Sequence, residues 1–148
     1  MKKLKCTLII GIIAILMLCG CGNSKSTAQQ EPTKPDNVSQ RVYELGCNVI
    51  KTTDAFLTGD ISIDDTSSKI DDLCTQIGLS EDDSYSQDAV IKVYALGISI
   101  NLISIKGTIS MNDLCDMLGE SRASANENIN NLYEYRDNIA KQLGIATK

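Results

Sequence analysis

Two cysteines two residues apart, Cys19 and Cys21, are the residues whose type and spacing most directly suggest chemistry. Thiolates at this spacing could supply half of a zinc site or form a redox pair. A zinc site needs further ligands, and the chain has no histidine and no other cysteine pair nearby. The residues that precede the two cysteines indicate a different role.

The segment before the cysteines has the layout of an export signal. Residues 1–5 carry three lysines and no acid, and residues 8–18 are apolar apart from one glycine. A basic start followed by an apolar stretch of about 7–15 residues is typical of a secretory signal peptide. A membrane-spanning helix needs about 20 apolar residues, so the segment is short for that role. A transmembrane anchor with incidental cysteines is the alternative.

The sequence Leu18-Cys19-Gly20-Cys21 resembles the lipobox of bacterial lipoproteins, in which a small residue precedes an obligatory cysteine. The resemblance implies cleavage after Gly20 and attachment of diacylglycerol to the Cys21 thiol. Bulky Leu18 makes Cys19 a poor alternative. Two acyl chains, such as palmitate, are enough for stable anchoring. The resemblance thus implies a protein on the outer face of the cell membrane, and the style of residues 21–26 is typical of Gram-positive bacteria.

The segment after Cys21 is polar, contains both prolines of the chain and has no apolar period. This composition predicts a flexible tether. We therefore expect a signal peptide over 1–20, a lipidated cysteine and tether over 21–36, and a helical domain over 37–148. About 110 residues are enough for one domain with a modest core.

Composition narrows what this domain can do. The chain has a net charge of −5, and without the three signal lysines eleven basic residues face nineteen acidic ones, a net charge of −8. Such a domain has no electrostatic reason to bind nucleic acid or anionic lipid. The lack of histidine removes the commonest general base and metal ligand, and no nucleophile or phosphate-binding motif is present. We therefore expect that the protein is not an enzyme and that it binds no cofactor and no metal.

Three cysteines remain in the domain, Cys47, Cys74 and Cys115. An odd number leaves at least one thiol unpaired within a monomer. We expect each to be a small buried residue on a helix. The alternative is a disulfide between Cys74 and Cys115, which occupy matching positions of the internal repeat described below.

Oxygen-bearing side chains recur between Asp60 and Asp71 at the ligand positions of a calcium-binding EF-hand loop. The pattern departs from an EF-hand loop at two essential positions. Asp65 stands in place of the central glycine, and Asp71 stands in place of the final glutamate. Helix capping explains Ser62 and Asp65 without a metal. We therefore expect no calcium site.

Three short motifs occur twice along the domain in the same order. They are VYELG (42–46) and VYALG (93–97), GDISIDD (59–65) and GTISMND (107–113), and IDDLCTQIG (70–78) and MNDLCDMLG (111–119). The shared order predicts a duplicated helical hairpin. In each copy a glycine, Gly59 or Gly107, is expected to end a helix, and a serine, Ser62 or Ser110, to cap the next.

Apolar residues at helical spacing predict an all-α antiparallel bundle of four to five helices. The expected helices cover 36–58, 62–77, 83–106, 110–118 and 121–143. The helix over 83–106 is the most apolar and should be the central, most buried one. Alternating β-branched residues leave a strand as the alternative for its second half, 98–105.

Glycines and tyrosines recur on these helices. Gly46 and Gly97 lie at matching positions inside expected helices, which indicates close packing of neighbouring helices. The tyrosines are expected at the boundary of the bundle, with the ring in the core and the hydroxyl in water, and a binding patch is the alternative. They are Tyr43, Tyr94, Tyr133 and Tyr135. The polar run 126–131 is expected to face solvent.

Together these features predict a location rather than an activity. We expect a membrane-anchored extracytoplasmic lipoprotein whose domain is a non-enzymatic protein-interaction or accessory module. The alternative is a carrier with a cavity between helices for a small ligand or ion. An exposed apolar patch of several hundred Å² would favour the interaction module.

Overall fold

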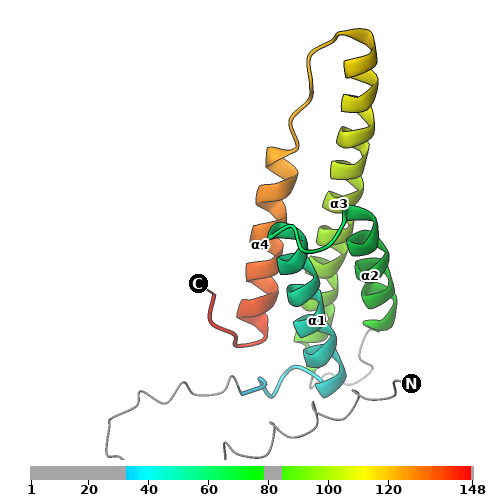
Figure 1. Ribbon diagram of the computed structural model, residues 1–148. Helices are drawn as coiled ribbons and strands as arrows, with labels where there is room; N and C mark the ends of the chain where they lie inside the picture. Colours follow the sequence, from blue (N-terminus) through cyan, green and yellow to red (C-terminus); the bar gives the residue numbers. More distant parts are fainter. Residues whose placement is uncertain (1–32, 79–84, 148) are drawn as a thin grey trace, which may run out of the picture. The chain divides into compact units, whose positions relative to one another are not determined.

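Four α-helices follow one another along the residues that the structure describes, 33–78 and 85–147, and no strand lies among them. In this computed structural model they pack as an antiparallel bundle (Figure 1). The helices are α1 (Gln40–Leu57), α2 (Ile63–Gln76), α3 (Gln87–Leu118) and α4 (Asn126–Gln142). The expected all-α bundle is confirmed. The strand alternative for 98–105 is wrong, because that stretch lies inside α3.

The turn between α1 and α2 forms as the sequence predicts. Gly59 adopts a left-handed backbone with a φ of 82°, and the Asp60 backbone N–H donates to the Ala55 carbonyl at 2.8 Å. The Ser62 Oγ accepts a hydrogen bond from the backbone N–H of Asp65 at 3.1 Å. The glycine ends α1 and the serine caps α2, because only glycine takes the left-handed conformation without strain.

The expected second turn is wrong, because Gly107 and Ser110 both lie inside the continuous helix α3. Thr108 stands where the first turn has Asp60, and its Oγ1 donates to the Ser104 carbonyl at 3.0 Å, as a helical side chain does. A glycine inside a helix costs about 1 kcal/mol relative to alanine. The continuing backbone hydrogen bonds of α3 outweigh that cost.

The chain reverses instead after α3, at Gly119, which has a φ of 71°. The Asn112 side chain holds the following loop by accepting from the Ala123 backbone N–H at 2.7 Å and donating to its carbonyl at 3.0 Å. Arg122 pairs with Asp116 across the same loop. The second helical hairpin is therefore α3 and α4, with a later turn than the sequence indicates.

The core lies where α3 meets the other three helices, all of which it contacts. α3 contributes five fully or nearly fully buried apolar residues, at intervals of three or four: Ile91, Ala95, Ile98, Leu102 and Ile105. These positions form one face of a helix. The other helices fill the space opposite with side chains such as Val49, Ile70 and Leu132.

Gly46 and Gly97 allow the close packing that the sequence predicts at these two positions. A Cβ on Gly46 would lie 3.0 Å from Leu143 Cδ1, and a Cβ on Gly97 would lie 3.0 Å from the Tyr135 ring. Such distances are tighter than ordinary van der Waals contact. Gly46 on α1 therefore packs against Leu143, which ends α4, and Gly97 on α3 packs against Tyr135 of α4.

Candidate interaction surface

α3 carries a second apolar face that no other part of the described chain covers. Ile100 is 63 % exposed and Met117 is 83 % exposed. The exposed large apolar residues of this helix are Val93, Leu96, Ile100, Ile103, Ile109, Met111, Leu114, Met117 and Leu118. This corrects the expectation that the most apolar helix is the most buried one. Its excess of apolar residues serves two opposite faces.

Most of these residues fall on one stripe that winds gradually around the helix. The stripe, called here the α3 seam, consists of positions that alternate in steps of three and four residues: Val93, Leu96, Ile100, Ile103, Gly107, Ser110, Leu114 and Met117. A repeat of seven residues with two contact positions is the pattern by which one helix packs lengthwise against another. All eight positions lie within one uninterrupted helix. The spacing is therefore that of a helix-packing surface.

Polar side chains border the α3 seam on the α2 side and tie α3 to α2. Ser99 Oγ donates to Asp71 Oδ1 at 2.6 Å, and Lys106 Nζ lies 2.7 Å from Asp64 Oδ1. The buried apolar residues of α3 set the rotation of the helix about its own axis, and these two contacts agree with it. The α3 seam consequently faces away from the core.

The C-terminal part of α3 extends beyond the turn that joins α1 and α2 (Figure 1). We call residues 107–118 the α3 overhang. Ile109, Met111 and Leu118, which lie on the overhang but not on the seam, are each about half or more exposed. By length and composition α3 could cross a membrane, because its most apolar stretch of 18 residues has a mean hydropathy of 1.5. Here one side of it is covered by α1, α2 and α4, as in the core helix of a bundle.

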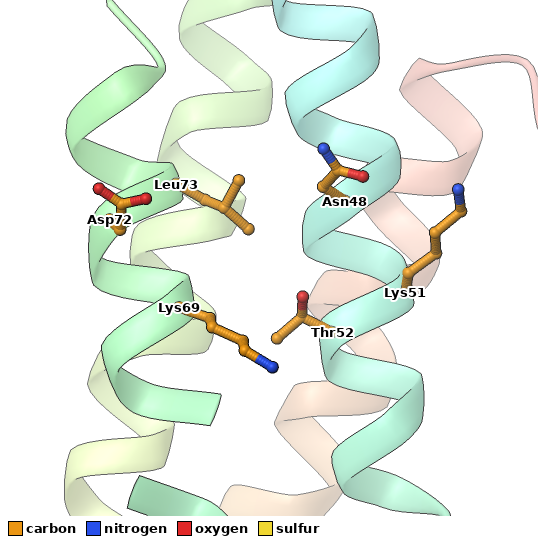
Figure 2. A pocket seen from close by; sticks show the side chains of 6 residues that line it. All are labelled: Asn48, Lys51, Thr52, Lys69, Asp72 and Leu73. Atoms are coloured by element: carbon orange, nitrogen blue, oxygen red, sulfur yellow. The ribbon is translucent and has the colours of Figure 1, made fainter. Parts of the chain in front are cut away.

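A shallow hollow of about 250 Å³ lies between α1 and α2 (Figure 2). Lys69 reaches from α2 toward Thr52 on α1, and Asn48, Lys51 and Asp72 line the rest with their side chains largely in solvent. Asp72 accepts a hydrogen bond from Gln76 at 2.7 Å. The hollow is open to solvent, and the half-buried Leu73 is its one large apolar lining residue.

The three cysteines of the domain are free thiols, so the alternative of a disulfide between Cys74 and Cys115 is wrong. Cys74 is buried on α2, whereas Cys115 lies on the α3 overhang, because α3 does not turn back at Gly107. Burial, with a smaller contribution from Asp71, raises the pKa of Cys74 to about 11. A thiol with a raised pKa is a poor nucleophile.

The acidic residues between Asp60 and Asp71 have separate partners. Asp60 accepts a hydrogen bond from Thr58, Asp64 pairs with Lys106, and Asp71 accepts from Ser99. Within the described ranges no three acidic or sulfur-bearing side chains converge on one point. Capping and contacts between helices account for the run.

The tyrosines do not gather into one patch. The Tyr94 and Tyr135 rings contact each other, with centroids 6.1 Å apart, in the packing between α3 and α4. Tyr43 is half-buried on α1, and Tyr133 is 47 % exposed on the outer side of α4. One residue of the polar run 126–131 is not simply solvated, because Asn131 donates to Asn101 Oδ1 at 3.2 Å.

Sequence reasoning missed the α3 seam, although its signal was present. The segment 83–106 is apolar at more positions than a single face can hold, which is typical of a helix covered on all sides. The three-and-four spacing of Val93, Leu96, Ile100 and Ile103 could have separated the second face from the core face.

No family model, curated protein or solved structure matches this chain. Cys21, the expected lipid attachment site, lies outside the described residues. The α3 seam is therefore the candidate functional site that the described domain offers.

Proposed function

We propose that this chain is a lipid-anchored extracytoplasmic protein whose domain binds another protein through the α3 seam. The observation that carries the proposal is the row of exposed apolar side chains on α3, spaced as a helix-packing surface. Monomeric soluble proteins rarely expose apolar patches beyond a few hundred Å² unless they bind something.

The properties of the face favour a protein partner over a small molecule. An amphipathic helix or groove recognises a helix through apolar anchors at steps of three and four residues. The α3 seam offers such anchors in Val93, Leu96, Ile100 and Ile103. The hollow between α1 and α2, by contrast, would bury little of a ligand, since ligand sites usually enclose most of the ligand surface.

The sequence before the domain supports the anchor. The basic start, the short apolar stretch and Leu18-Cys19-Gly20-Cys21 together favour lipidation at Cys21. The described domain begins at Thr33. Cys21 and Thr33 are twelve positions apart, and a chain of that length can span up to about 40 Å. This reach would let the anchored domain turn its α3 seam toward a neighbouring protein on the same membrane.

A Cys21→Ala variant tests the anchor. We expect the wild-type protein to be cleaved, to gain the mass of a diacylglycerol group and to remain with the membrane. The variant should keep its signal segment and carry no lipid. Intact-protein mass spectrometry and membrane fractionation measure both properties, and equal masses for the two proteins would contradict the proposal.

An Ile100→Glu variant tests the interaction surface. A buried unpaired charge in an apolar contact is strongly unfavourable, so the variant should lose its partner without unfolding, because Ile100 is 63 % exposed. The matched control is Tyr133→Glu, which places the same charge at an exposed apolar residue of α4. Chemical crosslinking on intact cells, followed by mass spectrometry, compares the partners captured by the two variants. Identical partners for both would contradict the proposal.

A further inference from the structure

We infer that the α3 seam binds a second copy of this chain, with the two α3 helices antiparallel. The inference rests on the proposed function, because it names the occupant of the same face. It follows from the order of large and small residues along the α3 seam and from the charges beside it, and the area available sets how strong the contact can be.

The order of residues makes the α3 seam complementary to itself when it is reversed. Large side chains occupy its first half, at Ile100 and Ile103, and small residues follow at Gly107 and Ser110. In an antiparallel pair centred between Ile103 and Gly107, Gly107 of one copy faces Ile103 of the other, and Ser110 faces Ile100. Leu114 then faces Leu96 at each end.

A parallel pair would lack this complementarity. Gly107 would face Gly107 and Ser110 would face Ser110, which leaves a gap in the middle of the contact. Protein interfaces pack as densely as protein interiors, where large and small residues alternate across the contact. The antiparallel arrangement therefore fills space that the parallel one leaves empty.

Charges beside the α3 seam favour the same direction. Lys92 lies next to its first position, and Asp113 and Glu120 lie at the corresponding places near its end. Antiparallel pairing places Lys92 of one copy about 8 Å along the axis, roughly one and a half helical turns, from Asp113 of the other. Lys106 lies near its own counterpart at the centre, but its ammonium is neutralised by Asp64 of the same copy at 2.7 Å. Parallel pairing would instead gather the acidic ends.

The α3 overhang gains neighbours in this arrangement. Residues 107–118 of one copy would lie beside residues 92–103 of the other, where α1, α2 and α4 support α3. The overhang of each copy then covers the exposed seam residues between 93 and 103 of the partner. The exposed ends of both helices are covered at once.

The area of the contact predicts a weak dimer. From Val93 to Met117 the α3 seam is about 36 Å long and about 10 Å wide, which buries roughly 800 Å² in total over two copies. Stable complexes bury about 1,200 Å² or more. Anchoring two copies in one membrane raises their effective concentration and makes a weak contact sufficient. The dimer is therefore expected on the membrane and only at high concentration in solution.

Disulfide trapping of the full chain in cells tests the inference. Two differently tagged copies, each also carrying Cys115→Ser, are expressed together, one with Ile100→Cys and the other with Ser110→Cys. Mild oxidation should link the two tags. Ser110→Cys expressed alone should not link to itself, because antiparallel pairing separates these residues by about 15 Å along the helices. Linkage of Ser110→Cys to itself would show a parallel pair and overturn the inference.

Further variants show whether the α3 seam causes the linkage. Adding Ile103→Glu to both copies should lower the yield of linked tags at least about tenfold, since it buries unpaired charges. Adding Tyr133→Glu should leave the yield unchanged. Adding Lys92→Glu should lower the yield, and combining it with Asp113→Lys should restore it. Equal yields in all of these backgrounds would overturn the inference.

The outcomes separate this inference from the proposed function. If no tags link but Ile103→Glu abolishes crosslinking to a different protein, the inference falls and the proposed function stands. If neither the linkage of the two tags nor crosslinking to any other protein depends on Ile103, both the inference and the proposed function are wrong. Both also fall if purified residues 22–148, which lack the signal segment and the lipid, bind lipid vesicles and Ile103→Glu abolishes that binding, because the face then contacts lipid.

Discussion

At the scale of single residues, glycines of α3 have opposite roles. Gly97 lies against the Tyr135 ring, whereas a Cβ on Gly107 would meet nothing within 4 Å. The first glycine is needed for packing between α3 and α4. The second only weakens the helix in the free chain, since glycine costs about 1 kcal/mol relative to alanine there.

The same substitution at these two glycines should therefore have opposite effects. Gly107→Ala should raise the free energy of unfolding by about 1 kcal/mol. Gly97→Ala should lower it, because forcing a methyl group against the ring costs about 1–3 kcal/mol and exceeds the gain in helix propensity. Urea unfolding of residues 22–148 measures both, and a stabilised Gly97→Ala variant would contradict the packing described here.

Cys74 predicts a specific dependence of stability on alkaline pH. Its pKa in the folded chain is raised from 9.0 to about 11, chiefly by burial. The unfolded chain releases this proton first, so the stabilisation is fully present below about pH 9 and is lost as the pH rises toward about 11. Wild type should lose more stability over that range than Cys74→Ala, measured by urea unfolding. Parallel curves for the two proteins would contradict the burial of this thiol.

At the scale of elements, the sequence predicts the existence of helices better than their ends. Serine caps and left-handed glycines are local signals, and Ser62, Gly59 and Gly119 act as such signals in the structure. Ser110 and Gly107 have the same residue types but lie inside α3. Other residues of the motif also differ between the two copies, because Thr108 stands where the first turn has Asp60. Which faces of α3 are buried depends on the helices that pack against it.

The two serines provide a matched test of this difference. Ser62→Ala removes the cap of α2 and should lower the free energy of unfolding by about 1 kcal/mol. Ser110→Ala lies in a helix interior, so it should leave stability unchanged or raise it by up to about 0.5 kcal/mol. Thermal or urea unfolding compares them. A loss of stability for Ser110→Ala that equals the loss for Ser62→Ala would indicate a second turn after all.

At the scale of the whole domain, the bundle is unevenly supported along its length. α1, α2 and α4 pack against one side of residues 91–105 of α3, whereas residues 107–118 extend past the α1–α2 turn (Figure 1). The proposed location rests on the segment before the domain, whereas the proposed interaction surface lies on α3.

Hydrogen exchange should reveal this uneven support. Helical amides with few buried neighbours open at lower free energy than those in a core. Residues 107–118 should therefore exchange faster than residues 91–105 in dilute solutions of residues 22–148, followed by mass spectrometry. Equal protection of the two segments at low concentration would contradict an unsupported overhang, whereas protection that rises with concentration fits the proposed dimer.

The most direct test of the central claim is site-specific photocrosslinking on intact cells. A benzophenone side chain at position 100, on the α3 seam, is compared with one at position 133, an exposed residue of α4. We predict a discrete crosslinked protein from position 100 and none from position 133. The absence of any protein crosslink from position 100, or the same products from both positions, would contradict the assignment of the α3 seam as the binding surface.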